Sequence, residues 1–107
     1  MKITATTIDA DDVTKMAEFW AAALDRKVVG DAAEGYVFLG DEGEPQRICI
    51  QHTDDDKSTK NRWHFDFESE DRAAEVDRLV GLGGTVDATH DDWVVLADVE
   101  GNLFCVF

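Results

Sequence analysis

The sequence repeats itself, and this repeat constrains the fold more than any other feature. Residues 35–42 return as residues 92–99: in both, an aromatic residue, a valine, a bulky apolar residue and a leucine run into a turn with an aspartate. Three more pairs of segments match in the same order, and the offset between them falls only from 59 to 56 residues. Four matches in one order indicate duplication of a single structural unit.

Each half is predicted to contain one strand, one helix and then three strands. Alternating, β-branched and aromatic residues predict the first strands at residues 3–8 and 63–67. Aspartate or serine residues that can cap a helix follow both strands, and Gly83-Gly84 ends the second helix. The other strands are predicted at residues 27–29, 35–39, 47–52, 85–88, 92–97 and 102–107. The expected fold class is therefore α+β, with two tandem βαβββ modules.

Length and composition limit the classes of protein and partner. A chain of 107 residues is expected to form one domain, with module one at 1–52, a polar linker at 53–60 and module two at 61–107. The net charge of −14 repels phosphate backbones and anionic lipid, so nucleic acid and membranes are not expected partners. The N-terminus lacks the apolar run of a signal peptide, and no run could span a bilayer. A cytoplasmic location is expected, with Cys49 and Cys105 reduced.

Three segments resemble a known family when they are taken together. They are residues 8–24, residues 60–66 and residues 92–105, whose last part has the pattern D-x-x-G-N-x-F. On a duplicated βαβββ pattern, they are similar to glyoxalase-like domains of the glyoxalase, bleomycin-resistance and dioxygenase (vicinal oxygen chelate) superfamily. The resemblance implies a curved mixed sheet that forms a half-barrel cup, with the helices on its outer face, a small-molecule ligand in the hollow, and a homodimer.

Strand periodicity predicts which side chains face that hollow. In residues 62–67, the apolar Trp63, Phe65 and Phe67 are expected to pack under the helix, and Arg62, His64 and Asp66 to share the opposite face. The same parity adds several residues to the hollow: Tyr36, Phe38, Arg47, Cys49, Gln51, Trp93, Val95, Cys105 and Phe107. Apolar walls around a few polar groups suit a small-molecule pocket, but aromatic residues that fill the second face of the sheet would give the same pattern.

A divalent metal is typical of the family, and the resemblance implies one ligand from the first and last strand of each module. His64 occupies the first-strand position of module two, but Ala5 occupies the matching position of module one. Cys105 replaces the last-strand ligand of module two, and Cys49 or Gln51 replaces that of module one. With one family ligand intact, no metal or other cofactor is expected. If a metal is bound, His64 and Cys105 are its expected ligands.

The sequence therefore predicts a metal-free, small-molecule-binding protein that is an enzyme or sequesters its ligand. His64 with Asp66 would supply acid–base chemistry, or His64 would be a core histidine bonded to Asp66. The other expected ligand-binding residues are Arg62, Gln51, Tyr36, Phe38, Trp93 and Cys105. One alternative is a metal-dependent lyase, isomerase or dioxygenase with His64 as a ligand. A structural or interaction module is another, because each of these residues could serve packing alone.

Overall fold

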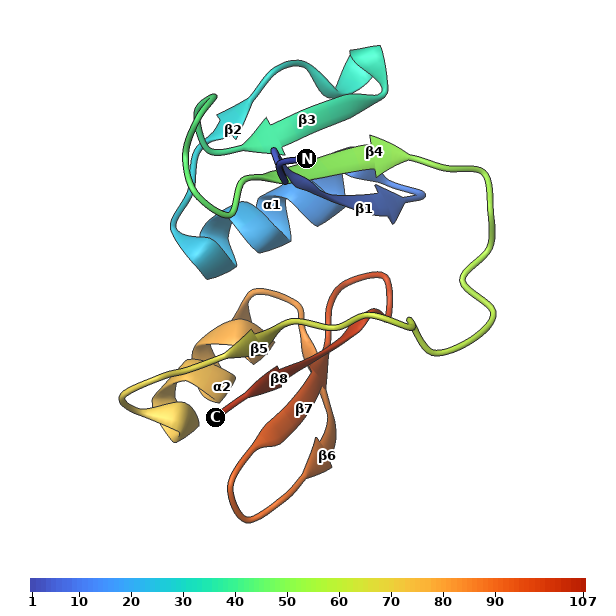
Figure 1. The fold of residues 1–107 in the computed structure, drawn as a ribbon. Helices are drawn as coiled ribbons and strands as arrows, with labels where there is room; N and C mark the ends of the chain where they lie inside the picture. Colours follow the sequence, from blue (N-terminus) through green and yellow to red (C-terminus); the bar gives the residue numbers. More distant parts are fainter. The chain divides into compact units, whose positions relative to one another are not determined.

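The computed structural model describes the whole chain, residues 1–107, as two compact units, Met1–Asp56 and Lys57–Phe107. Each unit has one α-helix and one four-stranded sheet, which are labelled in Figure 1. The first unit contains β1 (Thr6–Ala10), α1 (Val13–Leu24), β2 (Val28–Val29), a short 3-10 helix η1 (Ala32–Glu34), β3 (Tyr36–Leu39) and β4 (Ile48–His52). The second contains β5 (Asp66–Phe67), α2 (Arg72–Gly81), β6 (Thr85–Thr89), β7 (Val94–Ala97) and β8 (Leu103–Val106).

The two sheets have the same topology. Each has four strands, in the order β1-β4-β3-β2 in the first unit and β5-β8-β7-β6 in the second. In both, the first strand of the unit pairs in parallel with the last, and the other neighbours are antiparallel. The predicted α+β fold of two tandem βαβββ modules is confirmed.

In module one, α1 buries an apolar face against β3 and β4. The Asp12 side chain caps the helix by accepting a hydrogen bond from the backbone amide of Lys15, at 3.0 Å. Met16 and Trp20 are among the largest fully buried side chains. The core of this module contains Val13, Met16, Ala17, Phe19 and Trp20 from the helix with Val37, Leu39, Ile48 and Ile50 from the sheet. Burial of these side chains from water holds the helix on the sheet.

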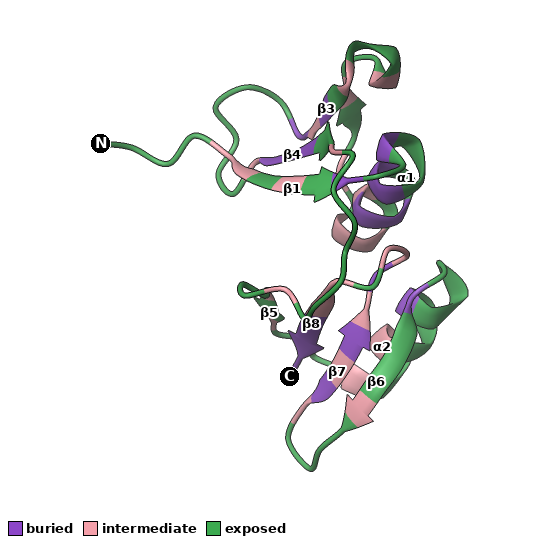
Figure 2. Ribbon diagram, turned by 90° about the vertical axis from the view of Figure 1, so that its right-hand side faces the viewer, coloured by how far each residue is buried: buried purple, intermediate pink, exposed green.

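Module two has a smaller core around β7 and β8. Asp71 caps α2 by accepting a hydrogen bond from the backbone amide of Ala74, at 3.0 Å. In α2 only Leu79 is buried, while Leu96, Phe104 and Val106 are almost completely buried in the sheet. Figure 2 shows this contrast, with buried residues on β7 and β8 and mostly exposed residues on α2.

Two predicted strands differ from those observed. The strand predicted at residues 3–8 runs from Thr6 to Ala10, because its ladder with β4 begins with the Thr6–Ile48 pair and ends with the Ala10–His52 pair. The strand predicted at 63–67 contains only Asp66 and Phe67, which pair with Cys105 and Val106. The prediction that Trp63 packs under the helix is wrong: this residue precedes the ladder and has a relative exposure of 80%.

No helix in the structure combines the length and the apolar character that crossing a membrane requires.

Candidate functional site

Pairing between strands fixes which residues of module two share a face of the sheet. Asp66 lies opposite Cys105, and Cys105 lies opposite Val95 on β7. Because directly paired residues point to the same side of a sheet, these three side chains line one face. Phe104 and Val106 alternate with Cys105 and are buried on the other face.

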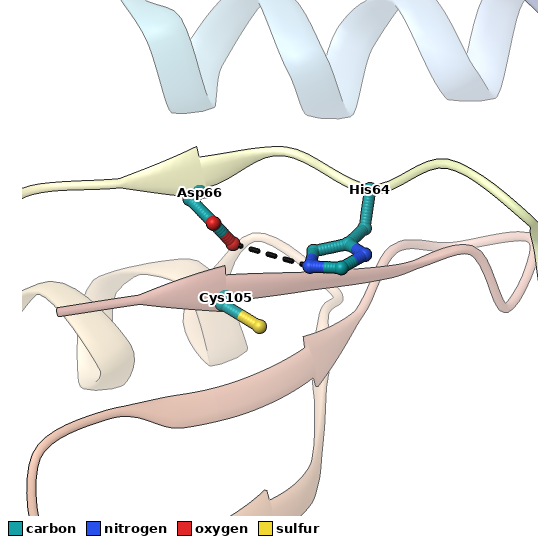
Figure 3. A group of neighbouring side chains, drawn as sticks. All are labelled: His64, Asp66 and Cys105. Atoms are coloured by element: carbon teal, nitrogen blue, oxygen red, sulfur yellow. Dashed lines mark ion pairs between the residues drawn. The ribbon is translucent and has the colours of Figure 1, made fainter.

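Three side chains with donor atoms gather on this face: His64, Asp66 and Cys105 (Figure 3). Their ligand atoms all lie within 4.8 Å of one another. The Nε2 atom of His64 is 3.3 Å from Oδ1 of Asp66, and the two side chains are 41% and 59% exposed. Since Cys105 is only 9% exposed, the cluster has a buried sulfur at its base and an accessible imidazole and carboxylate.

The environment of Cys105 keeps its thiol protonated. Burial is the main factor that raises the pKa of this thiol above its ordinary value. The negative charge of Asp66, and a hydrogen bond with it, raise the pKa further, while the charge of Lys60 opposes them weakly. Asp66 therefore interacts with both other members of the cluster, as the partner of the imidazole and of the thiol.

An aromatic stack extends the same face beyond Cys105. The rings of Trp93 and Phe107 are stacked with centroids 6.0 Å apart, and those of His90 and Trp93 are stacked at 4.3 Å. Phe107 is two residues beyond Cys105, so it lies roughly 7 Å further along the strand on the same side. The face thus combines a polar, ionisable cluster with a planar apolar surface.

Module one carries the equivalent positions without the ionisable cluster. Cys49 lies opposite Thr7 on β1 and Phe38 on β3, as Cys105 lies opposite Asp66 and Val95. Burial raises the pKa of the Cys49 thiol, while a hydrogen bond with Thr7 lowers it. Ala5, which precedes Thr7 by two residues as His64 precedes Asp66, has no donor group. Because the strand pairing around the two cysteines is equivalent, module one can be compared with module two position by position.

The other predicted residues of module one lie together on its sheet. Tyr36 lies opposite Gln51, and the ring of Tyr36 contacts that of Phe38 edge to face at 5.8 Å. The Arg47 guanidinium lies 3.6 Å from the centre of the Phe38 ring. Phe38 and Arg47 line a hollow of about 540 Å³, which the N-terminal segment and the β3–β4 turn complete.

The structure brings some predicted site residues together and leaves others apart. His64, Asp66 and Cys105 form one cluster, with Trp93 on the same face. Tyr36, Phe38 and Gln51 form a second group, on the sheet of module one. Arg62 is exposed and lies before β5, outside the ladder that aligns Asp66 with Cys105.

A second histidine has a defined place at the end of β4. The Nδ1 atom of His52 is 3.0 Å from the backbone oxygen of Asp11, and its Nε2 atom is 3.0 Å from Oδ1 of Asp54. Since both oxygens only accept hydrogen bonds, this arrangement suits the doubly protonated imidazolium. The same contacts, that with Asp54 first, raise the pKa of His52. His52 also lines a shallow hollow of about 480 Å³ beside Asp12.

The cluster in module two fits a divalent metal in donor type. Imidazole, carboxylate and thiolate all bind zinc, and three protein ligands with an open position are typical of catalytic zinc sites. Cys105 would have to lose its proton, which burial and Asp66 both oppose.

The fold of the chain is similar to that of many solved structures. A variant of the fosfomycin resistance protein FosX from Listeria monocytogenes, in complex with Mn(II) and 1S,2S-dihydroxypropylphosphonic acid, has 16% identity and a TM-score of 0.78, over 98% of this chain and 87% of that one. The hypothetical protein SA1046 from S. aureus has 14% identity and a TM-score of 0.74, over 99% and 92%. A glyoxalase/bleomycin resistance protein/dioxygenase family enzyme from Burkholderia phytofirmans has 17% identity and a TM-score of 0.71, over 96% and 94%.

These likenesses define a protein with the fold of the vicinal oxygen chelate superfamily. The sequence model of the glyoxalase-like domain matches residues 5–107, and the chain belongs to this family. The resemblance seen in the sequence is confirmed. No curated protein matches the sequence.

Proposed function

We propose that this protein binds a small organic ligand on the face of module two that carries His64, Asp66 and Cys105, without a resident metal. The observation that carries the proposal is the His64–Asp66 pair, 3.3 Å apart and accessible beside the buried thiol of Cys105. An accessible histidine held by a carboxylate binds polar groups and transfers protons near neutral pH. Membership of the glyoxalase-like family supports the class of ligand.

Each group has a distinct role in the proposed site. His64 donates a hydrogen bond to the ligand or exchanges a proton with it, while Asp66 orients the imidazole. Trp93 and Phe107 give a planar apolar surface on the same face. Arg62, Tyr36, Phe38 and Gln51 stay predicted ligand-binding residues. Whether the ligand is converted or sequestered depends on its chemistry, which the fold does not define.

A ligand screen by thermal shift tests the proposal. We expect at least one compound to raise the melting temperature of the wild-type protein and to lose this effect in His64→Gln. His52→Gln is the matched control, because His52 lies at the end of β4 in module one and has no place in the cluster. If a bound compound stabilises His64→Gln as much as the wild type, the ligand does not use His64 and the proposed site is wrong.

A metal-dependent lyase, isomerase or dioxygenase is the second candidate, favoured by the three donor atoms within 4.8 Å of one another. His64, Asp66 and Cys105 would hold the ion, which would supply Lewis-acid chemistry to a bound oxygen atom. Metal content by mass spectrometry separates the two candidates. About one ion per chain, lost in both His64→Gln and Cys105→Ser, would replace the metal-free proposal.

The proposal includes a cytoplasmic homodimer. Module two leaves large apolar side chains exposed on and beside α2, among them Val80 at 45%, Leu82 at 36% and Val86 at 47%. Contact with a second copy would remove such surface from water. Sedimentation velocity at micromolar concentration is expected to show a dimer, and a monomer across the accessible concentration range would contradict this part of the proposal.

A further inference from the structure

The side chain of Asn61 makes both hydrogen bonds that a strand would make with Leu103. Its Nδ2 atom donates to the Leu103 carbonyl at 3.0 Å, and its Oδ1 atom accepts from the Leu103 amide at 2.7 Å. The same Nδ2 atom also donates to the carbonyl of Trp63. One carboxamide therefore connects the first residue of β8 with the segment that leads into β5.

This carboxamide lies where the β5–β8 ladder would otherwise continue. The Phe107 amide donates to Phe67, and the Cys105 amide donates to Phe65, at 2.8 and 2.9 Å. In a parallel ladder, this period of two residues would next join the Leu103 amide to the Trp63 carbonyl. Asn61 binds both of these groups instead, so its side chain is inserted between them. The insertion explains why β5 begins at Asp66, although the sequence predicts a strand from residue 63.

His64 lies within the opened stretch, between Trp63 and Phe65. We propose that Asn61 is a positioning residue: by holding the ladder open at Trp63, its carboxamide sets the place of the His64 imidazole beside Asp66 and Cys105. The inference rests on the proposed function, because the imidazole that Asn61 positions is the centre of the proposed site. The fold itself does not require an amide side chain here, since in a closed ladder the Trp63 carbonyl would accept a hydrogen bond from the Leu103 amide equally well.

The possibility of a closed ladder separates a positioning role of Asn61 from a purely structural role. Without Asn61, the Leu103 amide and the Trp63 carbonyl can bond each other, as the next pairs along the ladder do. The hydrogen bonds that hold β8 would then be replaced, not lost. The arrangement of His64 would change, because the backbone on its N-terminal side would move toward β8.

The test compares the wild type with Asn61→Ala by NMR. In the wild type we expect through-space contacts between the ring protons of His64 and the β-protons of Cys105, since the donor atoms lie within 4.8 Å. In Asn61→Ala these contacts are expected to be lost, while the Leu103 amide stays protected from hydrogen exchange. Unchanged contacts between His64 and Cys105 in a folded Asn61→Ala protein would overturn the proposal.

A second variant and a control complete the experiment. Asn61→Asp keeps an oxygen for the Leu103 amide but cannot donate to the carbonyls of Trp63 and Leu103, so it is also expected to lose the His64–Cys105 contacts. Asn102→Ala removes an amide that donates to Asp98, and is expected to lower stability with those contacts intact. If Asn61→Ala does not fold, Asn61→Asp decides the matter, and failure of both to fold would overturn the proposal. No ligand is used, so the result is independent of whether the proposed binding is found.

Discussion

Cys105 lies opposite Asp66 in the parallel ladder that joins β8 to β5. Cys49 has the equivalent place in module one, but its partner is Thr7. Both thiols are buried, yet only Cys105 has a carboxylate and an imidazole as neighbours. The duplicated frame thus repeats the backbone and the cysteine, while the cluster of an imidazole, a carboxylate and a thiol occurs in one copy, and Cys49 has the charges of Arg47 and Asp9 near it instead.

Both thiols are expected to react slowly in the folded protein. Burial raises the pKa of Cys49 and of Cys105, so the reactive thiolate is scarce at neutral pH. Alkylation by iodoacetamide at pH 7.5, followed by peptide mass mapping, is expected to be slower than in denatured protein by at least about tenfold at both positions. Rapid labelling of Cys105 alone would show that its neighbours activate the thiol.

The core of module two depends on Phe104. This residue is 1% exposed, and its ring contacts that of Phe67 edge to face at 5.8 Å. Phe104→Ala is expected to lower the free energy of unfolding by about 3–5 kcal/mol, because it removes buried apolar surface and leaves a cavity. Trp63→Ala is the matched aromatic control, with an expected change within about 0.5 kcal/mol because Trp63 is exposed. Urea denaturation measures both, and equal effects would contradict the assignment of the core.

The buried carboxylate of Asp98 organises the turn between β7 and β8. Its Oδ1 atom accepts hydrogen bonds from the backbone amides of Glu100 and Asn102, at 2.9 and 3.0 Å. Asp98→Ala is expected to cost about 2–4 kcal/mol of stability, because part-buried donors lose a charged partner. Asp92→Ala, in the exposed turn before β7, is the control and should change little. A thermal unfolding curve of each variant checks the difference.

Protonation of His52 is expected to stabilise the folded protein. Asp54 first, and then the Asp11 backbone oxygen, raise its pKa above the ordinary value of 6.5. A raised pKa means that the stabilisation is fully present below pH 6.5 and is lost as the pH rises through the folded-state pKa. NMR titration of the imidazole is expected to show this raised pKa in the wild type and a lower pKa in Asp54→Asn. An equal pKa in both proteins would mean that the His52–Asp54 contact does not persist in solution.

The repeat and strand periodicity predicted most of the fold, because both depend on local patterns that a duplicated chain shows twice. Ile48 and Ile50 are buried on the face of the sheet that packs against α1, as their spacing predicts. The first strand of each module was placed less well. Its limits are set by pairing with β4 or β8, far away in the sequence, and alternation alone does not reveal that register.

The candidate site was predictable in its residue types but not in its detail. Period two placed His64, Asp66 and Cys105 on one face, and the family resemblance implied that His64 and Cys105 would be the ligands of any metal. Asn61 was missed as a functional candidate, because its role depends on a contact with Leu103 across the ladder. The only signal in the sequence was a carboxamide at the start of an otherwise strand-like segment. Trp63 was misplaced for the same reason. The inserted side chain of Asn61 keeps residue 63 out of the ladder, which begins only at Asp66.

The two helices differ in how firmly they are anchored. Five residues of α1 are buried, whereas in α2 only Leu79 is. Less buried apolar surface lowers the cost of local unfolding, so module two is the half that fluctuates more readily. A molecule that binds only its folded form would suppress those fluctuations by mass action. A ligand bound on the face around His64 would then reduce local unfolding throughout module two.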